Sequence, residues 1–191
     1  MEELKPDVLV VATGAAPLVP DNIPGIDREG VHTAWDVLKG EAALKPRNVV
    51  IVGGGSVGCE TADFLAELGD NLAMGRTTVT IVEMLRRIAM DMALETRHLL
   101  MGRLREKAVT IITAAKVKEI RDEGVVISRN GSDETLPNVD HIILALGSGP
   151  VEELSEKLRG KVGEIHVIGD AQKPRRAVEA IAEGRKIGMK I

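Results

Sequence analysis

Three glycines in the first third of the chain have the spacing found where a protein binds a nucleotide pyrophosphate. Gly53, Gly55 and Gly58 form a G-x-G-x-x-G pattern directly after an apolar run, 48–52, and directly before a segment of helical periodicity that starts at Ser56. The first glycine permits a tight turn, the second lets the backbone approach a pyrophosphate, and the third lets the helix pack closely on the strand. A strand before the pattern and a helix after it favour dinucleotide binding over an ordinary glycine-rich turn.

The residues around these glycines supply further candidate contacts. The backbone N–H groups around Ser56 and Val57, beside Gly54, are predicted to face the phosphates, because the first N–H groups of a helix lack partners and the helix dipole favours an anion. Glu60 is most simply a polar residue of the helix, although it is near enough to approach the nicotinamide end of a dinucleotide. No residue is assigned a catalytic role, and the histidines have no spacing that suggests a metal site.

An acidic residue that binds ribose is expected after the second strand of such a domain. The run 79–82 predicts this strand, and Glu83 follows it at about the expected distance from the glycines. A carboxylate at this position accepts hydrogen bonds from ribose hydroxyls and repels a 2′-phosphate, so NAD(H) is favoured over NADP(H). Arg86 and Arg87 come soon after, and guanidinium groups suit phosphate, which leaves NADP(H) open. A solvated loop is an equally good interpretation of the two arginines.

The order of apolar runs and helical segments predicts an α/β fold, with a Rossmann-like parallel sheet. Strands are expected at 8–12, 48–52, 79–82, 109–112, 141–145 and 165–168. Helices are expected at 35–38, 56–68 (capped by Gly69), 93–107 and 177–188 (preceded by Pro174, where the start of a helix tolerates a proline). Short pieces at 117–120 and 125–128, separated by turn residues, predict an antiparallel meander. The proline-rich segment 13–25 is interpreted as a linker and 70–78 as a polar loop.

Composition argues against several kinds of partner. The net charge is −4, the basic residues are scattered, and Trp35 and Phe64 are the only aromatic residues, so nucleic acid is not expected. The longest apolar runs are far shorter than the roughly 20 residues that span a bilayer, so no membrane association is expected. The single cysteine, Cys59, is interpreted as a small buried residue. The first six residues include acidic residues where a secretory signal would have basic and then apolar residues. Together with the single cysteine, this predicts a cytoplasmic protein.

A short repeat bears on domain organisation. Residues 7–17 match residues 140–150 in an aspartate, an apolar run, Ala-x-Gly and a proline. The second copy contains the last strand of a unit that starts with the strand before the Gly53 turn. No such glycine turn precedes the first copy. We therefore expect an N-terminal partner segment to be missing, and we expect strands without their neighbours to favour formation of a homo-oligomer.

Together these residues resemble the pyridine-nucleotide-dependent flavin oxidoreductases of the glutathione-reductase structural class. Similarity to the NAD(P)H domain lies in residues 49–60 (VVIVGGGSVGCE), 79–83 (VTIVE) and 143–147 (ILALG), and similarity to the FAD domain in residues 10–14 (VVATG) and 167–170 (VIGD). A narrower similarity lies in residues 24–26 (PGI), 35–38 (WDVL) and 83–85 (EML). It is to the C-terminal region of the NADH:flavin oxidoreductase group, which contains 2,4-dienoyl-CoA reductase, NADH oxidase and trimethylamine dehydrogenase.

This resemblance implies that NAD(P)H passes a hydride to FAD in the intact protein, from which electrons continue through an iron–sulfur cluster to FMN in an N-terminal barrel. It also implies cofactor contacts at Gly14, Gly147 and Asp170, although Asp170 is almost as well explained as a cap of the helix that follows. The chain lacks the barrel, the cluster cysteines and the FAD glycine motif. We therefore expect partial FAD-binding domains at 1–30 and 151–191 around an NAD(P)H-binding domain at 31–150, without FAD or activity in isolation.

Two other functions remain open at this stage. One is a non-catalytic nucleotide-binding or electron-transfer module that acts with a separate flavin subunit. The other, more remote, is an S-adenosylmethionine-dependent methyltransferase, whose fold also places a glycine turn after a first strand and an acid after a second. The meander after Val109 and the Gly169-Asp170 strand end argue against the methyltransferase.

Overall fold

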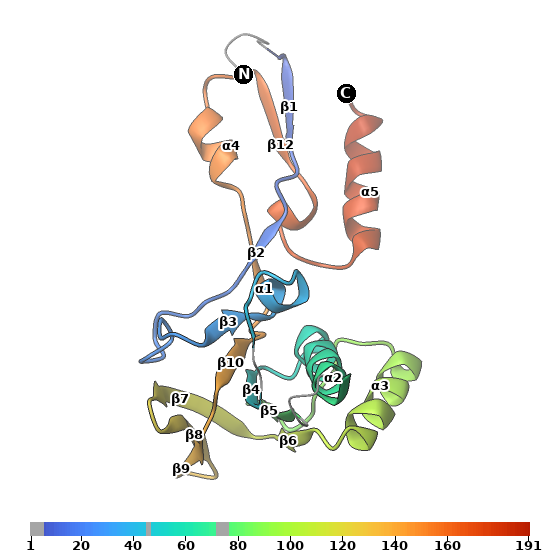
Figure 1. Ribbon diagram of the computed structural model, residues 1–191. Coiled ribbons are helices and arrows are strands. Elements are labelled where there is room, and N and C mark those ends of the chain that lie inside the picture. Colours follow the sequence, from blue (N-terminus) through green and yellow to red (C-terminus); the bar gives the residue numbers. More distant parts are fainter. Residues whose placement is uncertain (1–5, 45–46, 72–76) are drawn as a thin grey trace. The chain divides into compact units, whose positions relative to one another are not determined.

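The structure is a computed structural model that describes residues 6–44, 47–71 and 77–191 (Figure 1). The chain divides into two compact units. The larger unit is Val19–Gly147, and the smaller combines Met1–Leu18 with Ser148–Ile191. The assignment of these units to NAD(P)H-binding and FAD-binding domains stays a prediction.

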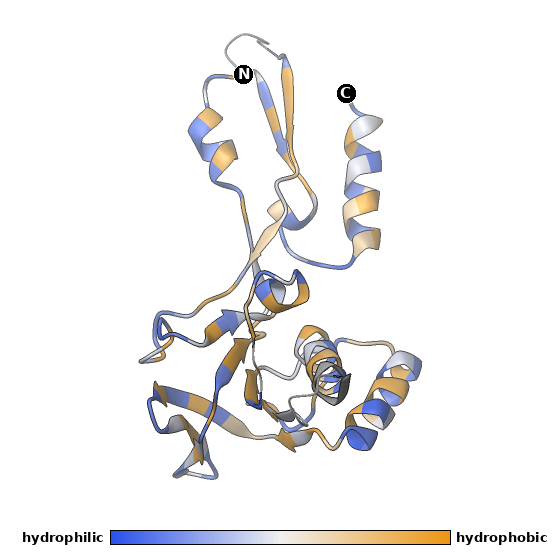
Figure 2. Ribbon diagram, in the orientation of Figure 1, coloured by the Kyte–Doolittle hydropathy of each residue, from blue (hydrophilic) through white to orange (hydrophobic). Residues whose placement is uncertain are grey.

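A five-stranded sheet forms the centre of the larger unit, and every neighbouring pair in it is parallel. Its strands, in spatial order, are β3 (Val31–Thr33), β10 (His141–Leu144), β4 (Asn48–Val52), β5 (Thr78–Val82) and β6 (Thr110–Ile112). β4, β5 and β10 are hydrophobic through most of their length, as the orange ribbon in Figure 2 shows. Such continuous apolar runs are typical of parallel strands that are covered on both faces.

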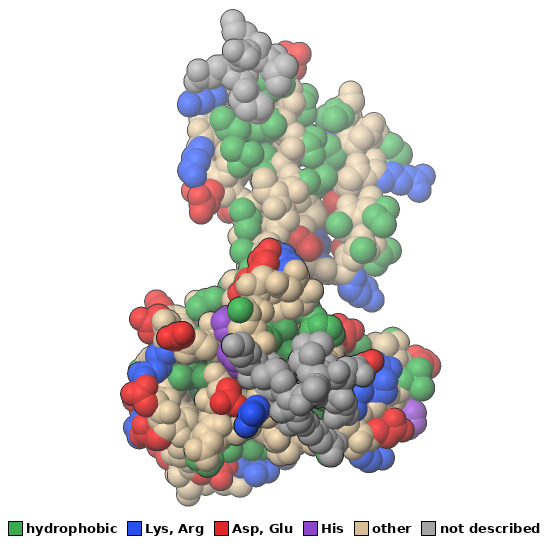
Figure 3. All heavy atoms as spheres, viewed as in Figure 1, with side chains coloured by type: hydrophobic (Ala, Val, Ile, Leu, Met, Phe, Trp, Pro, Cys, Tyr) green, Lys and Arg blue, Asp and Glu red, His purple; other side chains and the backbone are tan. Residues whose placement is uncertain are grey.

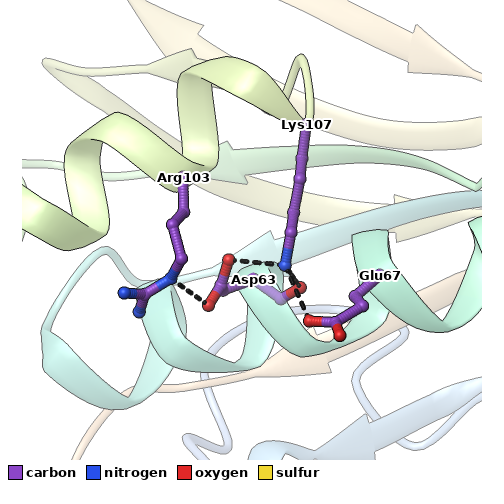
Figure 4. A network of polar contacts seen from close by, with 4 residues as sticks. All are labelled: Asp63, Glu67, Arg103 and Lys107. Atoms are coloured by element: carbon purple, nitrogen blue, oxygen red, sulfur yellow. Dashed lines mark hydrogen bonds and ion pairs between the residues drawn. The ribbon is translucent and has the colours of Figure 1, made fainter.

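Three helices cover one face of this sheet: α1 (Ala34–Leu38), α2 (Ser56–Asn71) and α3 (Leu94–Glu106). Val49 and Ile51 of β4 point into this layer, where they belong to one buried cluster with Leu65 of α2 and Leu104 of α3. Asp63 of α2 accepts from Arg103 of α3 and from Lys107, the residue directly after α3, so an ionic network also joins these two helices (Figure 4).

The predicted antiparallel meander covers the opposite face. It consists of β7 (Ala115–Arg121), β8 (Gly124–Arg129) and β9 (Ser132–Pro137), of which the third strand was not expected. Val50 and Val52, which alternate with the helix-facing residues of β4, pack with the meander residues Val125 and Ile127. Successive side chains of a strand point to opposite faces, so the apolar run of β4 contributes to both buried layers.

In its described part, the smaller unit contains two strand pairs, two α-helices and one short 3-10 helix. β1 (Val8–Val11) runs parallel to β12 (Glu164–Val167), and β2 (Ala15–Pro17) pairs antiparallel with β11 (Ser148–Pro150). Ala16 lies opposite Gly149, so the ends of the two repeat copies pair with each other. The remaining elements are α4 (Glu153–Leu158), the short η1 (Gly169–Ala171) and α5 (Ala177–Gly188).

Several local expectations need correction. Gly69 does not cap α2, which continues to Asn71. The helix α5 spans Ala177–Gly188 and Pro174 precedes it, as expected. The expected linker contains β2, and β3 and α4 were not expected at all. The predicted polar loop 70–78 lies partly outside the described residues.

Neither unit has a helix in its described part that is both long and apolar enough to cross a membrane. On the face seen in Figure 3, acidic and basic side chains are interspersed rather than gathered by sign.

Candidate nucleotide-binding site

The glycine turn lies at the carboxyl end of the central strand, between two neighbouring strand ends. Its first residue, Gly53, donates to Val82 O of β5 at 2.9 Å, and Ala145, just after β10, donates to Val52 O at 2.9 Å. The chain leaves β4 toward β5 and β6 and later returns to β10 on the other side of β4. This is the topological switch point, where parallel α/β sheets bind ligands.

Three of the four glycines in this turn are required by packing. Gly53 has φ +107°, and a Cβ atom there would lie 2.3 Å from Ala145 O. A Cβ atom at Gly58 would lie 2.1 Å from Gly53 O, so this glycine lets α2 approach the turn, as expected. At Gly54 a Cβ atom would lie 2.5 Å from the Ile88 side chain. The fold itself therefore explains these three residues.

Gly55 differs from the other three. Its φ is not in the left-handed region, and a Cβ atom there would meet only the two Asp91 carboxylate oxygens, at 3.6 and 3.9 Å. These are ordinary van der Waals distances. Packing therefore does not demand a glycine at this position, and its absent side chain leaves the backbone open to an approaching group.

The first turn of α2 presents unpaired donors beside Gly55. The first bond within the helix runs from Cys59 N–H to Gly55 O at 3.0 Å. In the described part of the chain, the N–H groups of Val57 and Gly58 have no hydrogen-bond partner. Such donors, at the positive end of a helix, can bind an anion.

The third donor of this turn is occupied by a residue that sequence reasoning missed. Ser56 N–H donates to both Asp91 oxygens, at 2.9 and 3.0 Å, and Ser56 Oγ donates to Asp91 Oδ2 at 2.6 Å. Partial burial by itself raises the pKa of Asp91, but the hydrogen bonds from Ser56 outweigh it and hold that pKa below its ordinary value. The only sequence signal is an aspartate between two methionines, which does not reveal the contact.

Glu83 lies beside the turn, at the end of β5, as predicted. Its side chain is almost buried, at 9% exposure, and it bonds to the backbone: Oε2 accepts from Gly54 N–H at 2.6 Å and Oε1 from Leu85 N–H at 2.7 Å. A carboxylate oxygen has two acceptor positions, so each can still accept from another donor. The contact of Glu83 with a ribose stays a prediction.

The other candidates surround the turn more loosely. Glu60 on α2 and Arg86 in the loop after β5 are exposed, which leaves both side chains accessible to a ligand. Cys59 is fully buried, and burial, together with the charges of Asp91 and Glu83, raises the pKa of its thiol to about 12. A thiol with this pKa stays protonated near pH 7 and is a poor nucleophile.

Three further candidates are Gly14, Gly147 and Asp170. Gly14 and Gly147 follow β1 and β10 with φ +81° and +90°, a left-handed conformation that explains why both repeat copies have a glycine there. Asp170 Oδ1 accepts from Arg175 N–H at 3.1 Å, in the segment before α5, which supports a local structural role. Contacts of these residues with a cofactor stay predictions.

The described part of the smaller unit contains no second turn of the Gly53 type. β1 leads through Gly14 into β2, and β12 leads into the three-residue η1. Neither strand passes through a glycine turn directly into a long helix, which is how such folds hold a dinucleotide pyrophosphate. Among the described residues, the Gly53 turn is thus the part of the chain with the features that suit a dinucleotide pyrophosphate.

Comparison with known proteins places this geometry in a family. A model of the pyridine nucleotide-disulphide oxidoreductase family matches residues 1–184. A metal reductase from Desulforamulus reducens is 38% identical over 95% of this chain, and an NADH oxidase from Thermoanaerobacter brockii is 36% identical over 98%. A solved structure of a 2-naphthoyl-CoA reductase has a TM-score of 0.87 at 32% identity and covers 100% of this chain.

The chain therefore belongs to the pyridine nucleotide-disulphide oxidoreductase family, and its nucleotide-binding fold is Rossmann-like. It spans 30% of the length of the metal reductase, 28% of the NADH oxidase and 28% of the 2-naphthoyl-CoA reductase.

Proposed function

We propose that the chain is the NAD(P)H-binding portion of a flavin-dependent oxidoreductase of the NADH:flavin oxidoreductase group. The Gly53–Gly58 turn binds the pyrophosphate of NAD(H), which is preferred over NADP(H). In the intact protein, bound FAD accepts the hydride of the nicotinamide. The family membership and the similarity to an NADH oxidase support this proposal.

The observation that carries the proposal is the open backbone at Gly55. The neighbouring glycines are needed for packing, whereas Gly55 is not, and it lies beside the unpaired N–H groups of Val57 and Gly58. A bare backbone next to free donors at a helix N-terminus is the arrangement that a pyrophosphate requires.

The surrounding residues have distinct roles in this proposal. The N–H groups of Val57 and Gly58 bind phosphate oxygens, and Glu83, fixed by its own bonds to the backbone, accepts from the adenosine ribose hydroxyls. Glu60 lies on the helix that starts at the phosphates and approaches the nicotinamide end. Arg86 is exposed near Glu83, where it contacts the adenosine end of the nucleotide.

The observations argue against one of the two alternative functions and are compatible with the other. Membership of an oxidoreductase family and a central sheet with only parallel pairs argue against the methyltransferase. A nucleotide-binding or electron-transfer module that works with a separate flavin subunit keeps the same turn and remains the second candidate.

A glycine substitution tests the proposal, because the atoms within 4 Å of a Gly55 Cβ atom are the carboxylate oxygens of the exposed Asp91, which can turn into solvent. Gly55→Val should fold normally yet lose NADH binding, measured by calorimetry, by at least about 100-fold, since its side chain enters the space of the pyrophosphate. Gly102→Val in α3 is the matched control, because a Cβ atom there meets nothing within 4 Å. If folded Gly55→Val binds NADH like wild type, the phosphate site lies elsewhere.

A further inference from the structure

Asp91 occupies the anion-binding end of α2. Both of its carboxylate oxygens lie within hydrogen-bond distance of Ser56 N–H, and one also accepts from the Ser56 hydroxyl. Charge-assisted hydrogen bonds of this kind are stronger than neutral ones. The chain thus places its own negative charge where the helix start favours an anion.

The same carboxylate occupies the open space at Gly55. Its oxygens lie 3.6 and 3.9 Å from the position of an absent Gly55 Cβ atom. A phosphate oxygen that approached Gly55 and accepted a hydrogen bond from Ser56 N–H would need this volume and the same donor. A carboxylate and a phosphate are both negatively charged, so they repel each other at this distance.

The backbone around Asp91 is fixed, whereas its side chain can turn away. Ala89 N–H donates to Gly54 O at 2.7 Å, and Arg97 Nε donates to Ile88 O at 3.0 Å, which holds the preceding segment against the turn. Asp91 itself is exposed. A rotation of its side chain into solvent therefore breaks the hydrogen bonds with Ser56 and the interaction with the N–H group of Asp91 itself, and leaves the path of the main chain unchanged.

We propose that Asp91 is an intramolecular competitor for the pyrophosphate position. A nucleotide binds the turn only after the Asp91 carboxylate leaves Ser56, so this residue weakens binding of pyrophosphate-containing ligands. The inference rests on the proposed function, because it concerns the same turn.

The test compares ligands with and without a pyrophosphate on the full 191-residue chain. Asp91→Ala should bind NADH and ADP about tenfold more tightly than wild type, because the competing charged hydrogen bonds are gone. Its affinity for adenosine should not change, since adenosine has no phosphate. A residue that merely supports the fold would not separate ADP from adenosine in this way.

Two further variants make the result decisive. Glu95→Ala removes the same charge from an exposed position in the first turn of α3 and should leave all three affinities unchanged. Asp91→Asn keeps an oxygen that accepts from Ser56 but has no charge, so it should fold if Asp91→Ala does not, and should bind ADP more tightly than wild type.

The outcomes distinguish this inference from the proposed function. If wild type binds NADH and the folded Asp91 variants bind NADH and ADP equally or more weakly, Asp91 is a structural cap and the inference is wrong. If neither wild type nor the variants bind NADH or ADP, the proposed function fails and the inference fails with it.

Discussion

At the scale of single residues, Glu83 lies at the end of β5, bonds to the glycine turn and is the residue from which we predict a preference for NAD(H). Its two oxygens are held by Gly54 and Leu85 N–H groups, so its charge has a fixed position beside the turn. A fixed carboxylate near the adenosine ribose repels a 2′-phosphate.

We predict that wild type binds NADH at least about fivefold more tightly than NADPH, which corresponds to about 1 kcal/mol. Glu83→Ala should narrow this gap, and it should also lower the free energy of unfolding by about 1–3 kcal/mol because it leaves two backbone N–H groups without their acceptor. The ratio of the two dissociation constants, measured by calorimetry on one variant, does not depend on the folded fraction. Glu95→Ala is the control for loss of charge, and a several-fold preference of wild type for NADPH would contradict the prediction.

The glycine pattern shows how far sequence reasoning reaches at this scale. The spacing correctly predicted a turn between a strand and a helix, and the close helix approach at Gly58. It could not predict that Gly54 is needed because of Ile88, or that Asp91 caps Ser56. Both contacts depend on how the loop after β5 lies on the turn, which no local pattern encodes.

At the scale of elements, Asp63 joins α2 to α3, two of the three helices that cover one face of the sheet. It accepts from Arg103 Nε and Lys107 Nζ, each at 2.8 Å, and its side chain is only 16% exposed (Figure 4). Burial by itself raises the pKa of Asp63, but the two cationic partners outweigh it and hold the pKa below its ordinary value.

We predict that Asp63→Asn lowers the free energy of unfolding at pH 7 by about 1 kcal/mol, because a charged acceptor for two cations is lost. Since the folded pKa is depressed, this contribution is complete above the unfolded pKa of about 3.9 and is lost as the pH falls through the folded value. Urea unfolding at pH 7 and at lower pH measures the difference. Glu153→Gln, at an exposed surface pair with Lys157, should change stability little at either pH.

The predicted elements were most accurate where the pattern was local and strong. The strand 48–52, the helix 177–188 and the meander follow from apolar runs, helical periodicity and turn residues. β2 and β11 are three residues long and contain prolines, and each is ordered by a partner more than a hundred positions away. Sequence periodicity cannot detect such pairs, and this is why the segment around Pro17 was interpreted as a linker.

At the scale of the whole molecule, the chain contains one turn suited to a dinucleotide in its described part. The smaller unit has Gly14 and Asp170, but β1 and β12 do not lead into a phosphate-binding helix. Since most of the anchoring of a flavin dinucleotide would have to come from such a turn, this unit should hold FAD poorly by itself.

We therefore predict that the purified chain is colourless, binds NADH, and does not oxidise NADH by itself. Absorbance at flavin wavelengths and steady-state NADH oxidation measure this directly. If the chain is a module for a separate flavin subunit, oxidation should appear when that subunit is added. A yellow preparation with stoichiometric FAD and sustained NADH oxidation would overturn the prediction.

The central claim is that the Gly53–Gly58 turn binds the pyrophosphate of a nicotinamide nucleotide, and a crystal structure of the chain with NADH tests it most directly. We predict that phosphate oxygens lie within hydrogen-bond distance of Val57 and Gly58 N–H, over the bare backbone of Gly55, with the Asp91 carboxylate turned away from Ser56. A structure in which NADH lies at another site, or in which saturating NADH leaves this turn without phosphate contacts, would contradict the account.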